Sequence, residues 1–257
     1  MTYALGVAMA DIGLVAADTR SVTDDGLVTD HDELRFKNPL GGESLVLPTT
    51  FRKLRKLSGG WATGAGTYQW VELAFQAIRR HVADDLPGIA RSLAEMSERA
   101  IPALEAKYSG AGESIRHYSS IVVIHRTRTG FSQCVLNPQG RGATLLGAGG
   151  LFPPELPELE GQHLLRTYER GFREHKTLPG LAAGVRRIAE LFKQVYALCG
   201  PDKTVSDFVE IGATTRDRQG RHRDYHIGAT QHDALLGMGD TELRELIQRS
   251  ELPDGVL

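Results

Sequence analysis

The stretch TYALGVAMADIGLVAADTR, residues 2–20, decides the fold that we expect for this chain. Residues 3–9 are apolar and compatible with a β-strand, and residues 14–17 form a second short apolar run that stops at Asp18. Between the two runs, residues 11–13 (Asp-Ile-Gly) supply the residue types that favour a tight turn. Two strand-like runs separated by a few residues with Asp and Gly predict a β-hairpin.

The rest of the chain alternates between strand-like and helix-like segments. We expect strands over 51–57, 60–63, 119–126, 130–136, 143–147, 208–215 and 224–229, and helices over 68–85, 87–106, 161–175, 181–199 and 241–249. Pairs of helices between groups of antiparallel strands predict two sheets covered by helix layers, an α+β fold rather than βαβ units. Pro102 predicts a kink or an early end in the second helix. Residues 21–50 are rich in loop residues, and we interpret them as an excursion from a single domain over residues 1–257.

The composition excludes several classes of protein. Hydrophobic residues make up 41% and charged residues 24% of the 257 residues, as in ordinary globular proteins. A net charge of −2 gives no overall attraction to nucleic acid. The two cysteines, Cys134 and Cys199, exclude a disulfide framework, and we expect both to be buried apolar residues. No run has the roughly 18 apolar residues of a membrane span, and the first residues lack a signal-peptide pattern. We therefore expect a cytoplasmic protein that binds neither nucleic acid nor a membrane.

Thr2 is the first candidate for chemistry. Removal of Met1, which cellular processing favours before a small residue, would give Thr2 a free α-amine that can accept a proton near neutral pH. A hydroxyl nucleophile and its base would then belong to one residue. A lysine such as Lys53, paired with the carboxylate of Asp18 near that hydroxyl, would stay protonated and lower the hydroxyl pKa. The N–H of Gly64, at a strand end, could donate to an oxyanion.

Each of these residues also has a simpler interpretation. Many chains begin Met-Thr by chance, Asp18 alone fits a carboxylate that caps backbone N–H groups, and Lys53 alone fits a solvated strand lysine. Simpler interpretations are also favoured for four other features: a charged loop rather than a metal site at 30–33, an exposed basic turn around His222 and His226, packing roles for Trp61 and Trp70, and no dinucleotide site at 147–150.

The first residues resemble the start of a proteasome β-type subunit. The segments TYALGV and GLVAADTR match the family pattern from Thr2 through Gly6 to Asp18 and Arg20 without a gap. The resemblance covers most of the chain, and residues 1–20 are its most specific part. Later features agree with it: the lysine-leucine strand at 53–57, Gly64 at a strand end, two helix pairs, and a turn at Gly147-Ala148-Gly149-Gly150 after a strand.

The resemblance implies the four-layer αββα sandwich of N-terminal nucleophile hydrolases. It implies amide-bond hydrolysis of a peptide or protein substrate, with Thr2 as nucleophile and its own amine as base. It further implies that Asp18 and Lys53 activate the hydroxyl, that Gly64 binds the oxyanion and that Arg20 frames the site. No metal or organic cofactor is implied.

The resemblance also implies a homo-oligomer. We expect a stacked ring of six- or sevenfold symmetry, with a helical arrangement as the alternative. An ATP-dependent unfoldase is a partner that the resemblance allows without requiring it.

Three departures from the family pattern leave alternatives open. The family typically presents a serine where this chain has Ala148, and that serine bonds the N-terminal amine. A further carboxylate and serine of the family fall in segment 200–207, where Asp202 and Ser206 are candidates and Asp207 also fits a structural aspartate. The excursion at 21–50 is longer than in compact members. The alternatives are a non-catalytic or very weakly active proteasome-like ring protein, and a narrow-specificity amidase for a small molecule.

Overall fold

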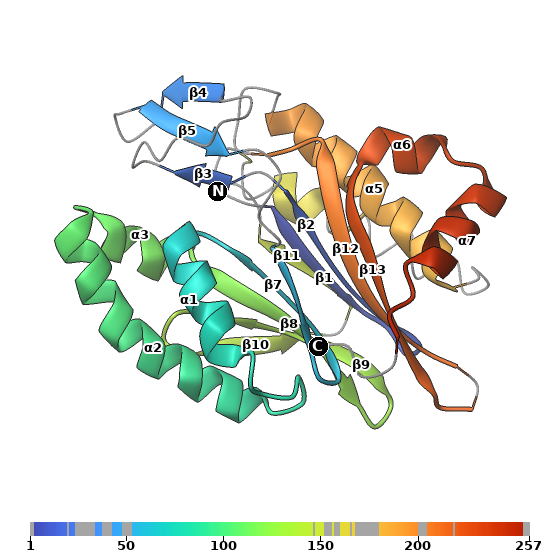
Figure 1. Ribbon diagram of the computed structural model, residues 1–257, viewed down its shortest axis with the longest axis horizontal. Helices are drawn as coiled ribbons and strands as arrows, with labels where there is room; N and C mark the ends of the chain where they lie inside the picture. The colour runs from blue at the N-terminus through green and yellow to red at the C-terminus, as the bar shows by residue number, and fades with distance from the viewer. Residues whose placement is uncertain are drawn as a thin grey trace.

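Two five-stranded antiparallel sheets form the centre of the computed structural model (Figure 1). The structure describes residues 3–19, 21–23, 34–37, 43–47, 53–145, 147–151, 156, 160–164, 166–167, 180–199, 205–217 and 219–253. The first sheet has the strand order β11 (Gly147–Leu151), β1 (Ala4–Ala8), β2 (Ile12–Asp18), β12 (Phe208–Arg216) and β13 (His222–Gln231). The second has the order β10 (Gly142–Leu145), β9 (Gly130–Leu136), β8 (Ser120–Thr127), β7 (Gly60–Ala65) and β6 (Leu54–Leu57).

The predicted hairpin at the start of the chain is confirmed. Strands β1 and β2 pair antiparallel, with Ala4 opposite Ala17 and Ala8 opposite Gly13. Every residue of both strands is buried. Because both faces of this hairpin are covered, its strands are continuous apolar runs rather than alternating ones.

The two sheets pack face to face through a small cluster of buried side chains. The first sheet contributes Ala8, Val15 and Ala17, and the second contributes Leu54, Trp61, Ile124 and Phe131. Trp61 lies directly over Gly212 of β12, where a Cβ atom would be 2.5 Å from the indole ring. Glycine at residue 212 therefore lets the bulky indole fit between the sheets.

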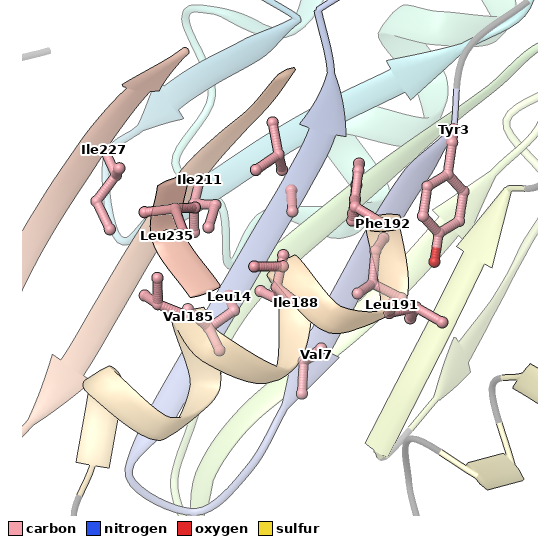
Figure 2. Close-up of a cluster of buried hydrophobic side chains, with 14 of the residues drawn as sticks. Tyr3, Val7, Leu14, Val185, Ile188, Leu191, Phe192, Ile211, Ile227 and Leu235 are labelled. Atoms are coloured by element: carbon pink, nitrogen blue, oxygen red, sulfur yellow. The ribbon is translucent and has the colours of Figure 1, made fainter. Parts of the chain in front are cut away.

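Helices cover the outer face of each sheet. Helix α5 (Gly180–Cys199) packs on the first sheet through side chains such as Val185, Ile188 and Phe192, as Figure 2 shows. The buried side chains of α1 (Tyr68–Ile78) and α2 (Leu86–Lys107) form one cluster with Ile121 and Val123 of the second sheet. In Figure 1, α1, α2 and α3 (Ala111–Tyr118) lie on one side of the sheets, and α5, α6 (His232–Gly237) and α7 (Asp240–Arg249) on the other. The expected α+β fold on two antiparallel sheets is thus confirmed.

The segment that we interpreted as an excursion contains a third, separate sheet. Strands β3 (Ser21–Thr23), β5 (Glu43–Leu47) and β4 (Leu34–Lys37) pair antiparallel in that order. None of the three belongs to the two large sheets. The charged loop predicted at 30–33 lies outside the described residues.

The helix predictions were partly wrong. The first helix ends at Ile78 rather than at residue 85, and Val82 is half-exposed outside it. The chain leaves the helix because the N–H of Ala83 donates to the carbonyl of Ser58, in the turn between β6 and β7. Helix α2 continues through Pro102 to Lys107, so the predicted early end is wrong.

Other helices were confirmed or missed. The predicted helices at 87–106, 181–199 and 241–249 correspond to α2, α5 and α7. The short helices α3 and α6 were not predicted. Of the helix predicted over 161–175, residues 161–164 and 166–167 are helical, and the others lie outside the described residues.

Candidate active site

The carboxylate of Asp18 joins three segments that are far apart in the sequence. Asp18 ends β2 and is fully buried. Its Oδ1 accepts a hydrogen bond from the backbone N–H of Tyr3 at 2.9 Å and another from Lys53 Nζ at 3.2 Å. Its Oδ2 accepts the backbone N–H of Ser206 at 3.3 Å. Among the described residues, three donors thus face this one ionisable group, which is the condition for holding a charge away from water.

Strand pairing explains why these residues meet. In the β1–β2 hairpin the N–H of Asp18 donates to the carbonyl of Tyr3, so residues 3 and 18 face each other. Ser206 precedes β12, which pairs with β2 through Val209 opposite Asp18. Lys53 directly precedes β6, at the edge of the second sheet. The cluster therefore lies where the ends of several strands from both sheets come together.

Lys53 is not a solvated strand lysine. The whole residue is 6% exposed, and its ammonium forms a buried ion pair with Asp18. The simpler interpretation of Asp18 holds in part, since the carboxylate does accept two backbone N–H groups. The structure therefore brings Asp18, Lys53 and Ser206 together. Thr2, Arg20 and Asp202 lie outside the described residues.

Thr19 is a member of this cluster that sequence reasoning missed. Its hydroxyl lies 3.3 Å from the hydroxyl of Ser206, and both residues are buried. The Ser206 hydroxyl also accepts the backbone N–H of Phe208 at 3.0 Å. The sequence feature that could have indicated it is its position directly after Asp18, where a polar residue continues a buried strand.

Tyr3 is the second residue that was missed. Its side chain is fully buried, and its ring centroid lies 4.4 Å from that of Phe192 on α5 (Figure 2). Burial raises the pKa of the Tyr3 phenol well above its ordinary value of 10.0, so the side chain is neutral at all physiological pH values. The aromatic contact and the hydrogen bond to Asp18 hold Tyr3 in place from two sides. Together they fix the start of β1.

Gly64 lies on β7, at the end of the β6–β7 pair where Lys53 precedes β6. Leu54 is opposite Thr63, so the residues next to them, Lys53 and Gly64, are at the same end. A Cβ at residue 64 would be 2.7 Å from Ile121 Cδ1 and 2.9 Å from Val71 Cγ1. Packing alone therefore accounts for the glycine, and its role as an oxyanion donor stays a prediction.

The expected turn at residues 147–150 is wrong. These residues belong to β11, an edge strand that pairs antiparallel with β1. Ala148 lies opposite Val7, and Leu151 lies opposite Ala4. At about 3.3 Å per residue, position 148 is about 10 Å along the strand from the end of β1 that adjoins Asp18. Ala148 thus lies nearer the turn of the β1–β2 hairpin than the end that carries Asp18.

The two histidines of the predicted basic turn are not simply exposed. His226 lies on β13, where its Nε2 is 2.7 Å from Glu210 Oε1 and its ring stacks on Trp61. His222 contacts the ring of Phe131 edge-on. Both contacts arise because β13 carries residues 222, 224 and 226 toward the second sheet. The prediction of exposed histidines is thus wrong.

Several predicted packing roles are confirmed. Trp61 and Trp70 are buried, and their indole N–H groups donate to the Ala213 carbonyl and to Ser97 Oγ. Cys134 and Cys199 are both buried. Asp207 Oδ2 accepts a hydrogen bond from Gln231 Nε2, which suits a structural aspartate, and its backbone carbonyl accepts the N–H of His232.

The described residues show neither a cluster of metal ligands nor a membrane-spanning helix. In the ranges given above, no group of three or more His, Cys, Asp or Glu side chains could hold a metal ion. Within the same ranges, no helix combines the length and the apolar character needed to cross a membrane.

Neither a protein-family model nor a curated protein sequence matches the chain. A functional assignment therefore depends on the chemistry of the cluster itself.

Proposed function

We propose that this chain is a threonine-type peptidase or amidohydrolase of the proteasome β type, with the αββα sandwich of N-terminal nucleophile hydrolases. Thr2, exposed by removal of Met1, is the proposed nucleophile. The observation that carries the proposal is the buried Lys53–Asp18 ion pair held against the backbone N–H of Tyr3. That nitrogen is the amide nitrogen of the peptide bond between Thr2 and Tyr3. Asp18 Oδ1 therefore accepts hydrogen bonds from both the Lys53 ammonium and the amide next to the proposed nucleophile.

The proposed chemistry needs only groups of this chain. The Thr2 hydroxyl attacks the carbonyl carbon of an amide, and its proton passes to the Thr2 α-amine. The Lys53 ammonium, ion-paired with Asp18, stabilises the negative charge that develops on the hydroxyl oxygen. The proton on the α-amine is then transferred to the leaving amine as the C–N bond breaks. Water, deprotonated by the same amine, hydrolyses the resulting ester and frees Thr2.

Intact mass of the purified protein, before and after incubation with a peptide epoxyketone, tests the nucleophile. This electrophile needs both the hydroxyl and the free amine of an N-terminal threonine to close its ring adduct. We expect a chain without Met1 that gains one adduct, and no adduct on the Thr2→Ala variant. A chain that has lost Met1 yet reacts neither with the epoxyketone nor with a small electrophile lacking side chains would overturn the proposal.

A second candidate is a non-catalytic ring protein with the same fold. It is favoured by the bonds of Asp18 to Tyr3 and Ser206, which would stabilise the fold without any turnover. Under this candidate, the Thr2→Ala substitution leaves cleavage of every tested substrate unchanged. A narrow amidase for a small molecule, the remaining alternative, would be excluded by cleavage of peptides with broad side-chain tolerance.

Self-assembly and a cytoplasmic location are part of the same proposal. We propose a homo-oligomer, a stacked ring of six- or sevenfold symmetry or else a helical arrangement. An ATP-dependent unfoldase would deliver protein substrates if the ring encloses the site. Sedimentation velocity at micromolar concentration tests the assembly, and a stable monomer there would refute it.

A further inference from the structure

A second polar cluster lies at the opposite end of the first sheet from Asp18. Strand β2 starts at Ile12 and ends at Asp18, and β12 runs antiparallel to it, with Thr215 opposite Ile12. The next residue of β12, Arg216, donates its backbone N–H to the carbonyl of Asp11. The turns that join β8 to β9 and β12 to β13 therefore mark the end of the molecule away from the candidate active site (Figure 1).

Three side chains of this region form a continuous set, which we call the basic cluster: Arg126, Arg216 and His222. Arg216 is directly opposite His222 in the β12–β13 pair. The His222 ring meets the Phe131 ring edge-on, with the centroids 5.9 Å apart. Phe131 in turn is directly opposite Arg126 in the β8–β9 pair. The basic cluster thus draws residues from both sheets, at the rim of the core between them.

Among the described residues, no ion pair neutralises the two arginines of the basic cluster. In the part of the chain that the structure describes, neither Arg126 nor Arg216 forms an ion pair with a carboxylate. Arg126 Nε and His222 Nδ1 are buried and have no hydrogen-bond partner there. A buried donor without a partner is unfavourable, and native proteins rarely leave one unless a ligand or water satisfies it.

Two carboxylates lie near the cluster, and among the described residues neither forms an ion pair with Arg126 or Arg216. Asp224 accepts the hydroxyl of Thr214 through Oδ1 and the ammonium of Lys56 through Oδ2 at 3.1 Å. Asp84 accepts the backbone N–H of Arg126 at 3.0 Å. Within the described residues, the guanidinium groups of Arg126 and Arg216 thus have no carboxylate partner and are available to a ligand.

The two arginines also act electrostatically on His222. Burial lowers the pKa of His222 below its ordinary value of 6.5, and the charges of Arg126 and Arg216 lower it further. Asp224 and Asp84 act in the opposite direction and do not reverse the shift. The imidazole is therefore neutral at pH 7, when it can donate one N–H, and it lies in a positive potential.

We propose that Arg126, Arg216 and His222 bind a small oxyanion, the phosphate group of a small molecule or inorganic phosphate. Guanidinium groups donate paired N–H bonds to oxyanions, and a bound phosphate would satisfy the buried nitrogens of Arg126 and His222. Donors that come from three strands suit a tetrahedral anion better than a planar carboxylate. This proposal is independent of the proposed hydrolase function.

Thermal unfolding of the full chain with inorganic phosphate tests the site. The titration is done at pH 7.0 with sodium chloride added to keep ionic strength constant. We expect a saturable rise in the wild-type Tm, and at least a tenfold weaker apparent affinity in the Arg126→Gln/Arg216→Gln variant. The Arg128→Gln variant is the matched control, because Arg128 is exposed on the turn that follows Arg126, and it should respond like wild type. Acetate should bind at least tenfold more weakly than phosphate.

If the double variant does not fold, an NMR titration of His222 in the wild type tests the site instead. A bound anion raises the histidine pKa, so the midpoint of the His222 Hε1 signal should move upward with phosphate and not with chloride. An unchanged His222 midpoint, or equal Tm responses of the wild type and the double variant to phosphate, would overturn the proposal.

Discussion

Lys53 Nζ lies 3.2 Å from Asp18 Oδ1, and a second buried lysine on the same edge segment, Lys56, lies 3.1 Å from Asp224 Oδ2. The two pairs have the same chemistry and similar exposure of the lysine, since the lysine side chains are 7% and 11% exposed, but Asp18 is fully buried and Asp224 is 22% exposed. Only the first pair contacts the backbone N–H of Tyr3, through Asp18 Oδ1. The second pair is therefore a matched control for the first.

Replacing each lysine separates catalysis from stability. Lys53→Met leaves the Asp18 carboxylate buried without its cation, and we expect a loss of about 3–5 kcal/mol in the free energy of unfolding. Lys56→Met should also destabilise the fold, but less, because Asp224 is 22% exposed. We expect the epoxyketone adduct to form at least a hundredfold more slowly in Lys53→Met and at an unchanged rate in Lys56→Met. Time-resolved intact mass measures the rate of adduct formation, and urea unfolding measures the free energy of unfolding. Equal adduct rates in the two variants would show that the Lys53 ammonium does not activate the nucleophile.

Thr19 offers a smaller, local test of the same site. The Thr19→Val substitution removes the hydroxyl that contacts Ser206 and keeps the shape of the side chain. We expect a loss of about 1 kcal/mol in the free energy of unfolding, as for a typical buried hydrogen bond. If the contact also positions Ser206 for the reaction, adduct formation slows in Thr19→Val and recovers in Thr19→Ser, which retains a hydroxyl. A Thr19→Ser variant as slow as Thr19→Val would limit Thr19 to packing.

The pH dependence of stability should contain a contribution from His222. Its pKa is below 6.5 in the folded chain, so at acidic pH the unfolded chain binds the proton more readily than the folded one. The free energy of unfolding therefore falls as the pH drops from 6.5 through the folded-state pKa. We expect the wild type to lose more stability between pH 7 and pH 5 than the His222→Gln variant does.

Urea unfolding in phosphate-free buffer measures this difference, since phosphate is the proposed ligand of the basic cluster. The His117→Gln variant controls for the loss of an exposed histidine from α3. A wild type and a His222→Gln variant with parallel stability profiles would contradict the assigned direction of the shift.

The hairpin and the long helices could be predicted because their signals are local. Residues 3–9 and 14–17 are apolar without interruption, and the hairpin register then places Asp18 opposite Tyr3. Helix α5 has buried residues at helical spacing along its whole length. The end of α1 could not be predicted, because the contact between Ala83 and Ser58 depends on where β6 and β7 lie.

The candidate site could be predicted only in part, for the same reason. No local pattern shows that Lys53 meets Asp18, since they come from different sheets, and only the resemblance to a family suggested it. The glycines at 147–150 indicated a turn, yet they form an edge strand because β1 offers a pairing partner. Thr19 and Tyr3 carry no motif, and their roles follow from burial beside Asp18.

The close approach of the sheets at Gly212 gives a prediction about the fold alone. An added Cβ at residue 212 would lie 2.5 Å from the Trp61 ring, whose indole N–H is tied to the Ala213 carbonyl. The ring cannot move without losing that bond, so Gly212→Ala should cost at least about 1–3 kcal/mol, the usual range for overpacking. Gly228→Ala, on the neighbouring strand β13, meets nothing within 4 Å and should change the free energy of unfolding by less than about 0.5 kcal/mol. Urea unfolding of both variants, followed by tryptophan fluorescence, measures the difference. Equal stabilities would mean that the sheets separate easily at Trp61, contrary to the tight contact observed.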